Sequence, residues 1–249
     1  MKTFARWLGL LLVAFLALQL YFVARIATMA VVAPQSTSFQ RSEAWRLANE
    51  KGSLRWRQQW VAYNQISDNL KRAVIASEDD GFTNHEGVDW EALEKAWEKN
   101  AKAEARAAKQ APAKPSANPG KAASKPPKIV GGSTITQQLS KNLFLSGERT
   151  LVRKGQELVL TVLLERLLSK QRILEIYLNS VEWGEGIFGA EAAAQHYFRK
   201  PASQLSAYEA ARLAVMLPRP RYYEKLPNSG YLASRAGVIA GRMGDAQLP

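Results

Sequence analysis

Two adjacent carboxylates, Glu78 and Asp79, are the side chains in this sequence best suited to proton transfer. They follow an apolar run and are themselves followed by Phe82, His85 and Gly87, so residues 78–87 also hold an aromatic ring and one of only two histidines. A carboxylate held close to a hydroxyl can act as a general base. A lone Glu-Asp pair is more often a solvated acidic turn, so the rest of the sequence must decide between the two interpretations.

A second polar group falls on one face of a predicted helix. Thr134, Gln138 and Lys141 are spaced i, i+4 and i+7, with Asn142 beside them. From the pattern alone this face points either to a ligand or to solvent. Arg153 and Glu157 follow, four residues apart, and they are either a surface ion pair worth about 0.3 kcal/mol or part of a site for an anion.

Read in order, these clusters resemble the family 51 glycosyltransferases, which polymerise the glycan strands of peptidoglycan from lipid II. The resemblance spans roughly residues 45–243, in blocks at residues 77–87, 131–144, 149–157, 170–179, 186–194 and 217–220. It implies a mainly α, lysozyme-like domain. Tyr177 and Asn179 lie in a block that we expect to be mainly structural.

By this resemblance Glu78 is the base that takes the proton from the GlcNAc 4-hydroxyl as it attacks MurNAc C1. Asp79 is expected to orient the site through hydrogen bonds, and its like charge can raise the pKa of the pair. Lys141 and Arg153 match the basic residues that neutralise the departing undecaprenyl pyrophosphate. Glu157 matches a second essential carboxylate, which orders either Arg153 or a divalent cation. No cofactor is required, and Mg²⁺ or Mn²⁺ at the pyrophosphate remains an open alternative.

Other residues match substrate-binding positions of the family. They are Phe82, His85, Gly87, Thr134, Gln138 and Asn142. His85 has no second histidine or cysteine nearby, so we predict no metal site from it. The chain contains no cysteine, which excludes disulfides and thiolate metal sites.

The first residues predict a membrane anchor. No charge interrupts the 18 residues from Trp7 to Ala24, which would span about 27 Å as a helix. Lys2 and Arg6 precede this run, and basic flanks stay in the cytoplasm. We therefore expect a single-pass inner-membrane protein with a cytoplasmic stub and anchor over residues 1–34 and a periplasmic domain over residues 35–249. A cleaved signal peptide is the alternative, but the run is long for one.

The net charge of +12 is unevenly distributed, because residues 101–128 hold seven Lys or Arg against one Glu. This Ala-, Lys- and Pro-rich segment predicts a disordered insertion. A domain outside the cytoplasm is not expected to bind nucleic acid. The expected partners are the membrane, lipid II and the nascent lipid-linked strand, with other wall-synthesis or division proteins as further candidates.

Helical patterns dominate the rest of the sequence, apart from a short strand near Val181 to Trp183. The features we expect are a helix ending near Glu78 before Gly81, Asp89 capping a helix from Trp90 to about Asn100, Ser133 capping a helix through Leu145, a buried central helix from Glu157 to Leu168, and a helix that Ser206 begins and Pro218 closes.

Two other functions are consistent with parts of the sequence. A glycan hydrolase would also use a glutamate, but it would keep that group protonated as an acid. A scaffold of the wall-building complex would need only the fold. The basic residues at positions 141 and 153 favour departure of a pyrophosphate, and the absence of Ser-x-x-Lys predicts no transpeptidase activity.

Overall fold

The computed structural model describes residues 2–52, 55–110, 132–148 and 150–249. Its helices are α1 (Lys2–Met29), α2 (Ser38–Lys51), α3 (Asp68–Glu78), α4 (Trp90–Gln110), α5 (Ile135–Phe144), α6 (Leu151–Leu167), α7 (Lys170–Ser180), α8 (Ala190–Phe198), α9 (Ala207–Met216), α10 (Pro220–Glu224) and α11 (Gly230–Arg242). Short 3-10 turns occupy Tyr63–Gln65 and Ala202–Gln204. The predicted mainly α fold with one amino-terminal apolar helix is confirmed.

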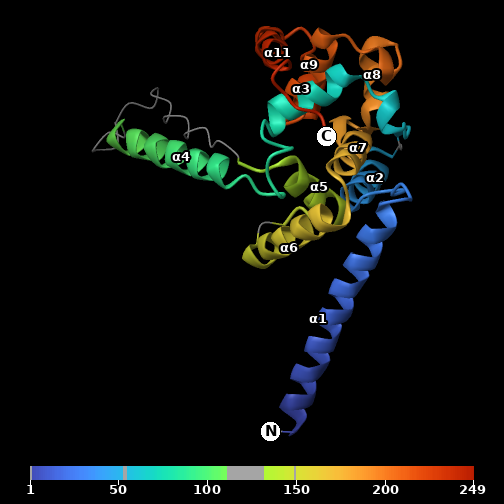
Figure 1. Ribbon diagram of the computed structural model, residues 1–249, viewed down its shortest axis with the longest axis vertical. Coiled ribbons are helices and arrows are strands. Elements are labelled where there is room, and N and C mark those ends of the chain that lie inside the picture. The colour runs from blue at the N-terminus through green and yellow to red at the C-terminus, as the bar shows by residue number, and fades with distance from the viewer. Residues whose placement is uncertain (1, 53–54, 111–131, 149) are drawn as a thin grey trace.

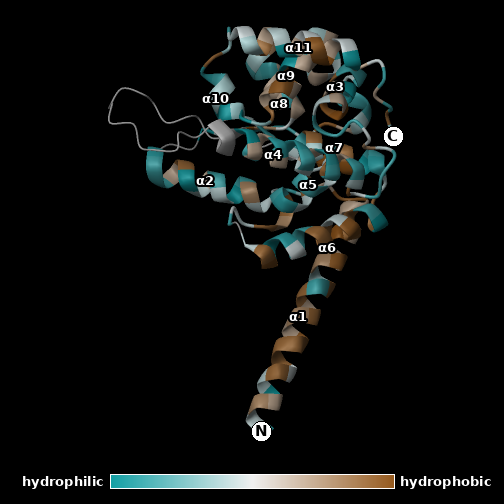
Figure 2. Cartoon of the chain, turned by 90° about the vertical axis from the view of Figure 1, so that its left-hand side faces the viewer, coloured by the Kyte–Doolittle hydropathy of each residue, from teal (hydrophilic) through white to brown (hydrophobic). Residues whose placement is uncertain are grey.

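Helix α1 projects from the domain (Figure 1) and is predominantly apolar along its length (Figure 2). Only the stripe of Phe22, Ile26 and Met29 near its carboxyl end is buried. Phe22 packs edge-on against Phe144 of α5, with ring centroids 5.4 Å apart. The helix is therefore long and apolar enough to cross a membrane, while its last turns belong to the core of the domain.

The domain has two parts along its long axis. Helices α3, α9 and α11 pack together at the end remote from α1, and α2, α5 and α6 lie next to α1 (Figure 1). Helix α7 runs between them and buries Tyr177 completely. The indole of Trp183 is also fully buried and donates to the carbonyl of Leu213 in α9 at 3.1 Å. One continuous apolar core thus supports both walls of the space between the two parts.

A small sheet lies at the edge of this core. Its strands are β1 (Arg57–Gln58), β2 (Glu182–Gly184) and β3 (Ile187–Phe188). They pair in the order β1-β3-β2, with β1 parallel and β2 antiparallel to β3. The predicted short strand is thus confirmed, one residue later than expected. Gly186 turns the chain between β2 and β3 at φ +74°, where a Cβ would lie 1.9 Å from the carbonyl oxygen of Arg55.

Helix α3 ends at Glu78, before Gly81, as predicted. Other helix ends differ from the prediction. The cap of α5 is Thr134, in a capping box with Gln137, in place of Ser133. Helix α4 continues to Gln110, so the first ten positions of the expected 101–128 loop are helical. Their alanines and lysines favour a helix, and the prolines come later. The remainder of that predicted insertion lies outside the described residues.

The prediction of a buried central helix over residues 157–168 is wrong. Helix α6 buries only one stripe, consisting of Glu157, Leu160, Thr161 and Leu164. Its other face exposes apolar side chains, namely Leu151, Val152, Leu158, Val159, Val162 and Leu167. A helix that is apolar on every side can be surrounded by protein or by lipid. Only one side of α6 packs against protein.

Candidate active site

Glu78 occupies the last position of α3, at the edge of the space between the two parts of the domain. The side-chain amide of Gln138 in α5 donates to Glu78 Oε2 at 3.0 Å, and the Ser77 hydroxyl lies 3.4 Å from Oε1. Burial raises the pKa of Glu78, the two hydrogen bonds oppose this shift, and the charge of Asp79 adds to it. A carboxylate with a raised pKa is a stronger base than an exposed one.

Gln138 is itself oriented by Tyr177, whose hydroxyl donates to Gln138 Oε1 at 2.9 Å. This bond leaves the amide NH₂ of Gln138 to face Glu78. Burial, with the charges of Glu78 and Asp79 nearby, raises the pKa of Tyr177, so its hydroxyl stays a donor. We expected Tyr177 to be mainly structural. Its hydroxyl is instead hydrogen-bonded to Gln138, the residue that donates to the Glu78 carboxylate.

We predict that Tyr177→Phe lowers the polymerisation rate about tenfold, since the freed Gln138 amide can turn its oxygen toward Glu78 and repel it. Tyr63→Phe is the matched control, because the buried Tyr63 hydroxyl has no hydrogen-bond partner among the described residues. Rates of the two variants should be measured beside their thermal unfolding. Equal rates for both would remove Tyr177 from the positioning of Gln138.

Asp79 turns away from Glu78 and braces the loop that follows. Its Oδ2 accepts from the backbone N–H of Ile135 at 2.9 Å, and its Oδ1 lies 2.8 Å from His85 Nε2. Because His85 Nδ1 accepts from the Gly87 N–H, Nε2 carries the proton of the neutral ring and donates to Asp79. The Thr134 hydroxyl completes this hydrogen-bond network by donating to the Gly87 carbonyl at 2.6 Å.

This hydrogen-bond network fixes the amino terminus of α5 against the loop after α3. Gly87 sits at φ +86°, where a Cβ would lie 2.7 Å from Thr161 Cγ2, so the close approach needs glycine. Phe82 is fully buried below the loop, with the ammonium of Lys170 4.6 Å from its ring centroid. Asp79, Phe82, His85, Gly87 and Thr134 are therefore placed to support the site from behind.

Asp79, His85 and Asp89 each offer one potential metal-ligand atom, and these atoms lie within 4.8 Å of one another. The sequence did not suggest this grouping, because Asp89 was expected only to cap a helix. It does cap α4, with Oδ1 accepting from Ala92 N–H at 2.8 Å. Since His85 Nε2 is a donor to Asp79, binding of a cation there would require the loss of that proton.

The cationic cluster, Lys141, Arg153 and Lys154, lies near the carboxyl end of α5 and at the start of α6. Arg153 donates to Glu157 Oε2 at 2.8 Å, and Lys154 pairs with the other oxygen of the buried Glu157. Burial lowers the pKa of Lys141, and the charge of Glu157 opposes this. The buried Nε of Arg153 has no acceptor among the described residues.

Two hollows meet at these groups. The first, of about 500 Å³, is lined by the cationic cluster, Gln138, Asn142 and Glu157, and the second, of about 460 Å³, is lined by Glu78 and the start of α4. Ser133 borders both. The polar face of α5 predicted from residues 138, 141 and 142 therefore faces a cleft and not open solvent.

Two charged residues in this cleft were not predicted from the sequence. Lys154 was adjacent to Arg153 in the motif, and its position was the available signal. Glu182 in β2 lines the cleft on the side away from α5. Its Oε1 accepts a hydrogen bond from Arg221 Nε at 2.8 Å, and Arg221 also pairs with Glu43. Burial raises the pKa of Glu182 to about 7, and Arg221 opposes the shift. Only the fold brings these three residues together.

Comparisons with known proteins agree with this geometry. A model of the Transglycosylase family matches residues 46–110 and 120–244. The chain is 54% identical over 249 residues to a biosynthetic peptidoglycan transglycosylase of Burkholderia thailandensis, covering 98% of this chain and 89% of the relative. It is 49% identical over 248 residues to a protein of the same description from Paraburkholderia phytofirmans, covering 98% and 94%.

The cleft holds the Glu78 carboxylate toward one end and the cationic cluster toward the other, an arrangement that suits a group-transfer enzyme. The chain belongs to the transglycosylase family. It is accordingly a glycosyltransferase.

Proposed function

We propose that this enzyme polymerises lipid II into the glycan strands of peptidoglycan, as its relatives' descriptions suggest. The observation that carries the proposal is the arrangement along α5. Gln138 holds Glu78, and Lys141 lies about one helical turn further on, next to Arg153. The carboxylate and the cationic cluster are thus spaced about one helical turn apart along α5.

In the proposed reaction, the donor strand lies with its pyrophosphate against the cationic cluster, and a lipid II molecule enters beside Glu78. Glu78 takes the proton of the GlcNAc 4-hydroxyl while that oxygen forms its bond to MurNAc C1. The bond from C1 to the pyrophosphate oxygen breaks on the opposite side, so the configuration at C1 inverts. Lys141, Arg153 and Lys154 neutralise the charge that accumulates on the leaving undecaprenyl pyrophosphate.

Glu157 is the carboxylate that orders this cluster. Both of its oxygens are already paired with cations, one with Arg153 and one with Lys154. A divalent ion at Glu157 would compete with these two cations, and the proposed reaction has no step that requires Mg²⁺ or Mn²⁺. Assaying polymerisation of lipid II with and without a chelator tests this point directly.

Glycan hydrolysis is the second candidate, because the raised pKa of Glu78 would also suit a general acid. A hydrolase expels a sugar hydroxyl and has no need of the cationic cluster that lines the cleft. Purified protein should therefore form strands from lipid II and leave finished sacculi intact. Cleavage of sacculi without polymerisation would reverse the assignment. The proposal includes no peptide cross-linking, since the sequence contains no Ser-x-x-Lys.

We further propose that α1 crosses the inner membrane with its amino terminus in the cytoplasm, and that the apolar face of α6 rests in the outer leaflet. The support is the docking of α1 on α6, where Gln19 and Gln156 exchange side-chain hydrogen bonds of 3.3 and 3.2 Å. Leu151, the first residue of α6, is 91% exposed. An apolar helix face beside a membrane anchor is stabilised by contact with lipid.

The absence of cysteine makes this placement testable with single labels. We predict that a fluorophore on Val159→Cys in α6 is quenched by lipid-borne quenchers in reconstituted vesicles. The matched control is Val238→Cys in α11, because the two valines are 45% and 47% exposed and α11 lies at the end remote from α1 (Figure 1). Equal quenching at both positions would contradict the placement of α6.

A further inference from the structure

A third cavity, of about 920 Å³, lies outside the cleft and is larger than either of its hollows. It is bounded by the carboxyl end of α2, by β1, by the turn between β2 and β3, by α8 and by the end of α10. The residues that give it its chemical character are Leu47, Arg55, Trp56, Arg57, Ile187 and Lys225. Apart from Ile187, which lies in the block at residues 186–194, none of them belongs to the blocks of the family resemblance, and the proposed reaction uses none of them.

The charge of this cavity is positive. Lys51 neutralises Glu185 at 2.5 Å, whereas Glu224, which accepts from the backbone N–H of Glu185 at 2.9 Å and lies 3.8 Å from His196 Nε2, keeps its negative charge, so the cations still outnumber the carboxylates. Arg55, Arg57 and Lys225 have no acidic partner within the described part of the chain. Three cations without counter-ions around one concave surface attract an anionic ligand.

The backbone that carries these arginines is fixed. Arg57 N–H donates to the Gly186 carbonyl at 2.8 Å, and β1 pairs with β3 at Arg57 and Ile187. The Arg55 carbonyl packs against Gly186 so closely that no side chain fits there. Trp56, between the two arginines, stacks on Phe188 with ring centroids 4.5 Å apart. The backbone therefore places both arginines beside a fixed apolar surface.

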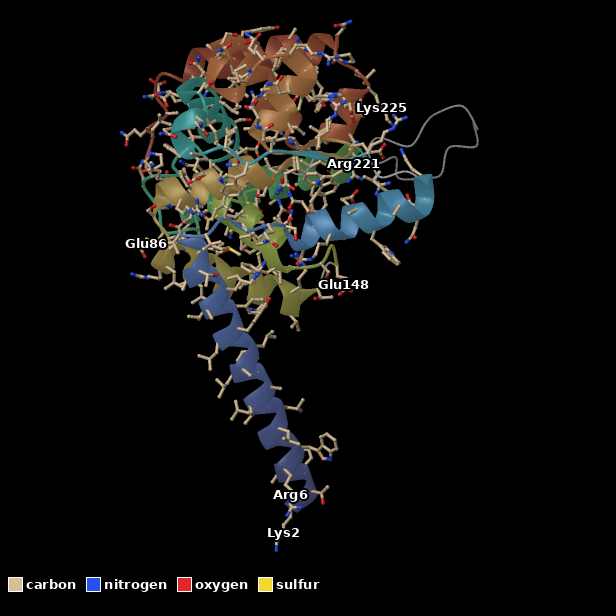
Figure 3. All side chains as sticks on the ribbon, turned by 90° about the vertical axis from the view of Figure 1, so that its right-hand side faces the viewer. Lys2, Arg6, Glu86, Glu148, Arg221 and Lys225 are labelled. Carbon is tan, nitrogen blue, oxygen red and sulfur yellow. The ribbon has the colours of Figure 1, made fainter. Side chains whose placement is uncertain are left out.

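Its position argues against a lipid headgroup. Arg221 and Lys225 lie on the side of α2 opposite to α1, whose Arg6 marks the far end of the anchor (Figure 3). The cavity shares no lining residue with the cleft, but two segments of the chain run from one to the other. Phe39 of α2 and Pro220 of α10 line the cleft, and Lys51 and Lys225 at the other ends of these segments line the cavity. Five residues of α10 rise only about 7 Å.

We propose that this cavity binds the carboxylate-bearing peptide carried by the glycan strand that the cleft extends. The inference rests on the proposed function, because it takes the occupant of the cleft to be peptidoglycan. The peptide is the part of that polymer with free carboxylates, which Arg55 and Arg57 bind with charge-assisted hydrogen bonds. Trp56 and Leu47 contact its aliphatic groups. The strand is thereby held at a second point beyond the reacting sugars.

The test titrates the full-length protein in detergent with a soluble disaccharide-peptide fragment of peptidoglycan and measures its Kd by calorimetry. We expect the Arg55→Ala/Arg57→Ala double variant to bind about tenfold more weakly or worse, given the strength of charge-assisted hydrogen bonds. Arg166→Ala/Arg235→Ala, which removes two exposed arginines elsewhere, should bind like the parent. The same fragment with its carboxylates converted to amides should bind the parent as weakly as the native fragment binds the Arg55/Arg57 variant.

An unchanged Kd in the Arg55/Arg57 variant, or equal binding of the amidated fragment, would overturn the inference. So would displacement of the fragment by inorganic phosphate at equal concentration, since that would indicate a general anion site. The fragment needs no turnover, so its binding is measured independently of polymerisation. Binding without polymerisation by the parent would contradict only the proposed function, and polymerisation without binding would contradict only this inference.

Discussion

Glu78→Gln should abolish polymerisation of lipid II, with a loss of at least about a hundredfold, while the domain stays folded. Glutamine keeps the shape of the side chain and can still accept the hydrogen bond from Gln138, but it cannot take the proton of the attacking hydroxyl. The rate should be measured beside the thermal unfolding curve. Glu86→Gln, an exposed carboxylate on the same loop (Figure 3), should polymerise at the parent rate.

The pH dependence of the parent provides a second readout of the same group. A base acts when ionised, and the pKa of Glu78 is raised, so kcat/KM should fall as the pH drops through that raised value. In Gln138→Ala the loss of a hydrogen bond to the ionised form raises the pKa further, and the acid limb should move to higher pH. Glu78→Gln activity within tenfold of the parent would exclude Glu78 as the base.

The second large effect is expected at Arg153. If its guanidinium neutralises the leaving pyrophosphate, Arg153→Ala should lower turnover about a hundredfold, which corresponds to about 3 kcal/mol of transition-state stabilisation. Arg153→Lys keeps the charge but loses the forked geometry and the unpaired Nε, so its rate should fall between those of the parent and the alanine variant. Single-turnover rates on lipid II provide the measurement.

Arg166→Ala, on the exposed surface of the same helix, is the matched control. Removing Arg153 also leaves one oxygen of Glu157 without its partner, which can destabilise the fold by itself. The double variant Arg153→Ala/Glu157→Gln removes both charges, and its thermal unfolding should return toward that of the parent without recovery of activity. Recovery of activity in the double variant would reduce Arg153 to a counter-ion of Glu157.

Local patterns predicted the elements that depend on neighbouring residues. Ile135, Leu139 and Leu143 form the buried face of α5 as their spacing indicated, and the Ser206 capping box begins α9 with its Glu209 partner. Both features are decided within one or two helical turns. The same holds for Asp89 at the start of α4. Sequence is sufficient where a residue's partners lie within hydrogen-bonding reach along the chain.

The features that the sequence left undetermined depend on distant partners or on the surroundings. Tyr177 reaches Gln138 across 39 positions, and Arg221 reaches Glu182 across the same separation, so no local pattern marks either contact. Helix α6 shows a different limit. Its apolar composition is the same whether a face meets lipid or protein, and only the packing of its neighbours shows which face is uncovered.

The docking of α1 has a mechanical consequence for the enzyme. One stripe of this unbroken helix carries Gln19, Phe22, Ile26 and Met29. The anchor and the domain therefore move together as one rigid body. One residue inserted between Phe22 and Ile26 would rotate the anchor by about 100° against the domain and lengthen it by about 1.5 Å. In the proposed membrane placement, the length of this helix would set the height of the cleft above the headgroups and its helical phase would set the orientation. A flexible spacer at this point would let the cleft move away from the proposed substrate, whose lipid tail would keep it in the bilayer.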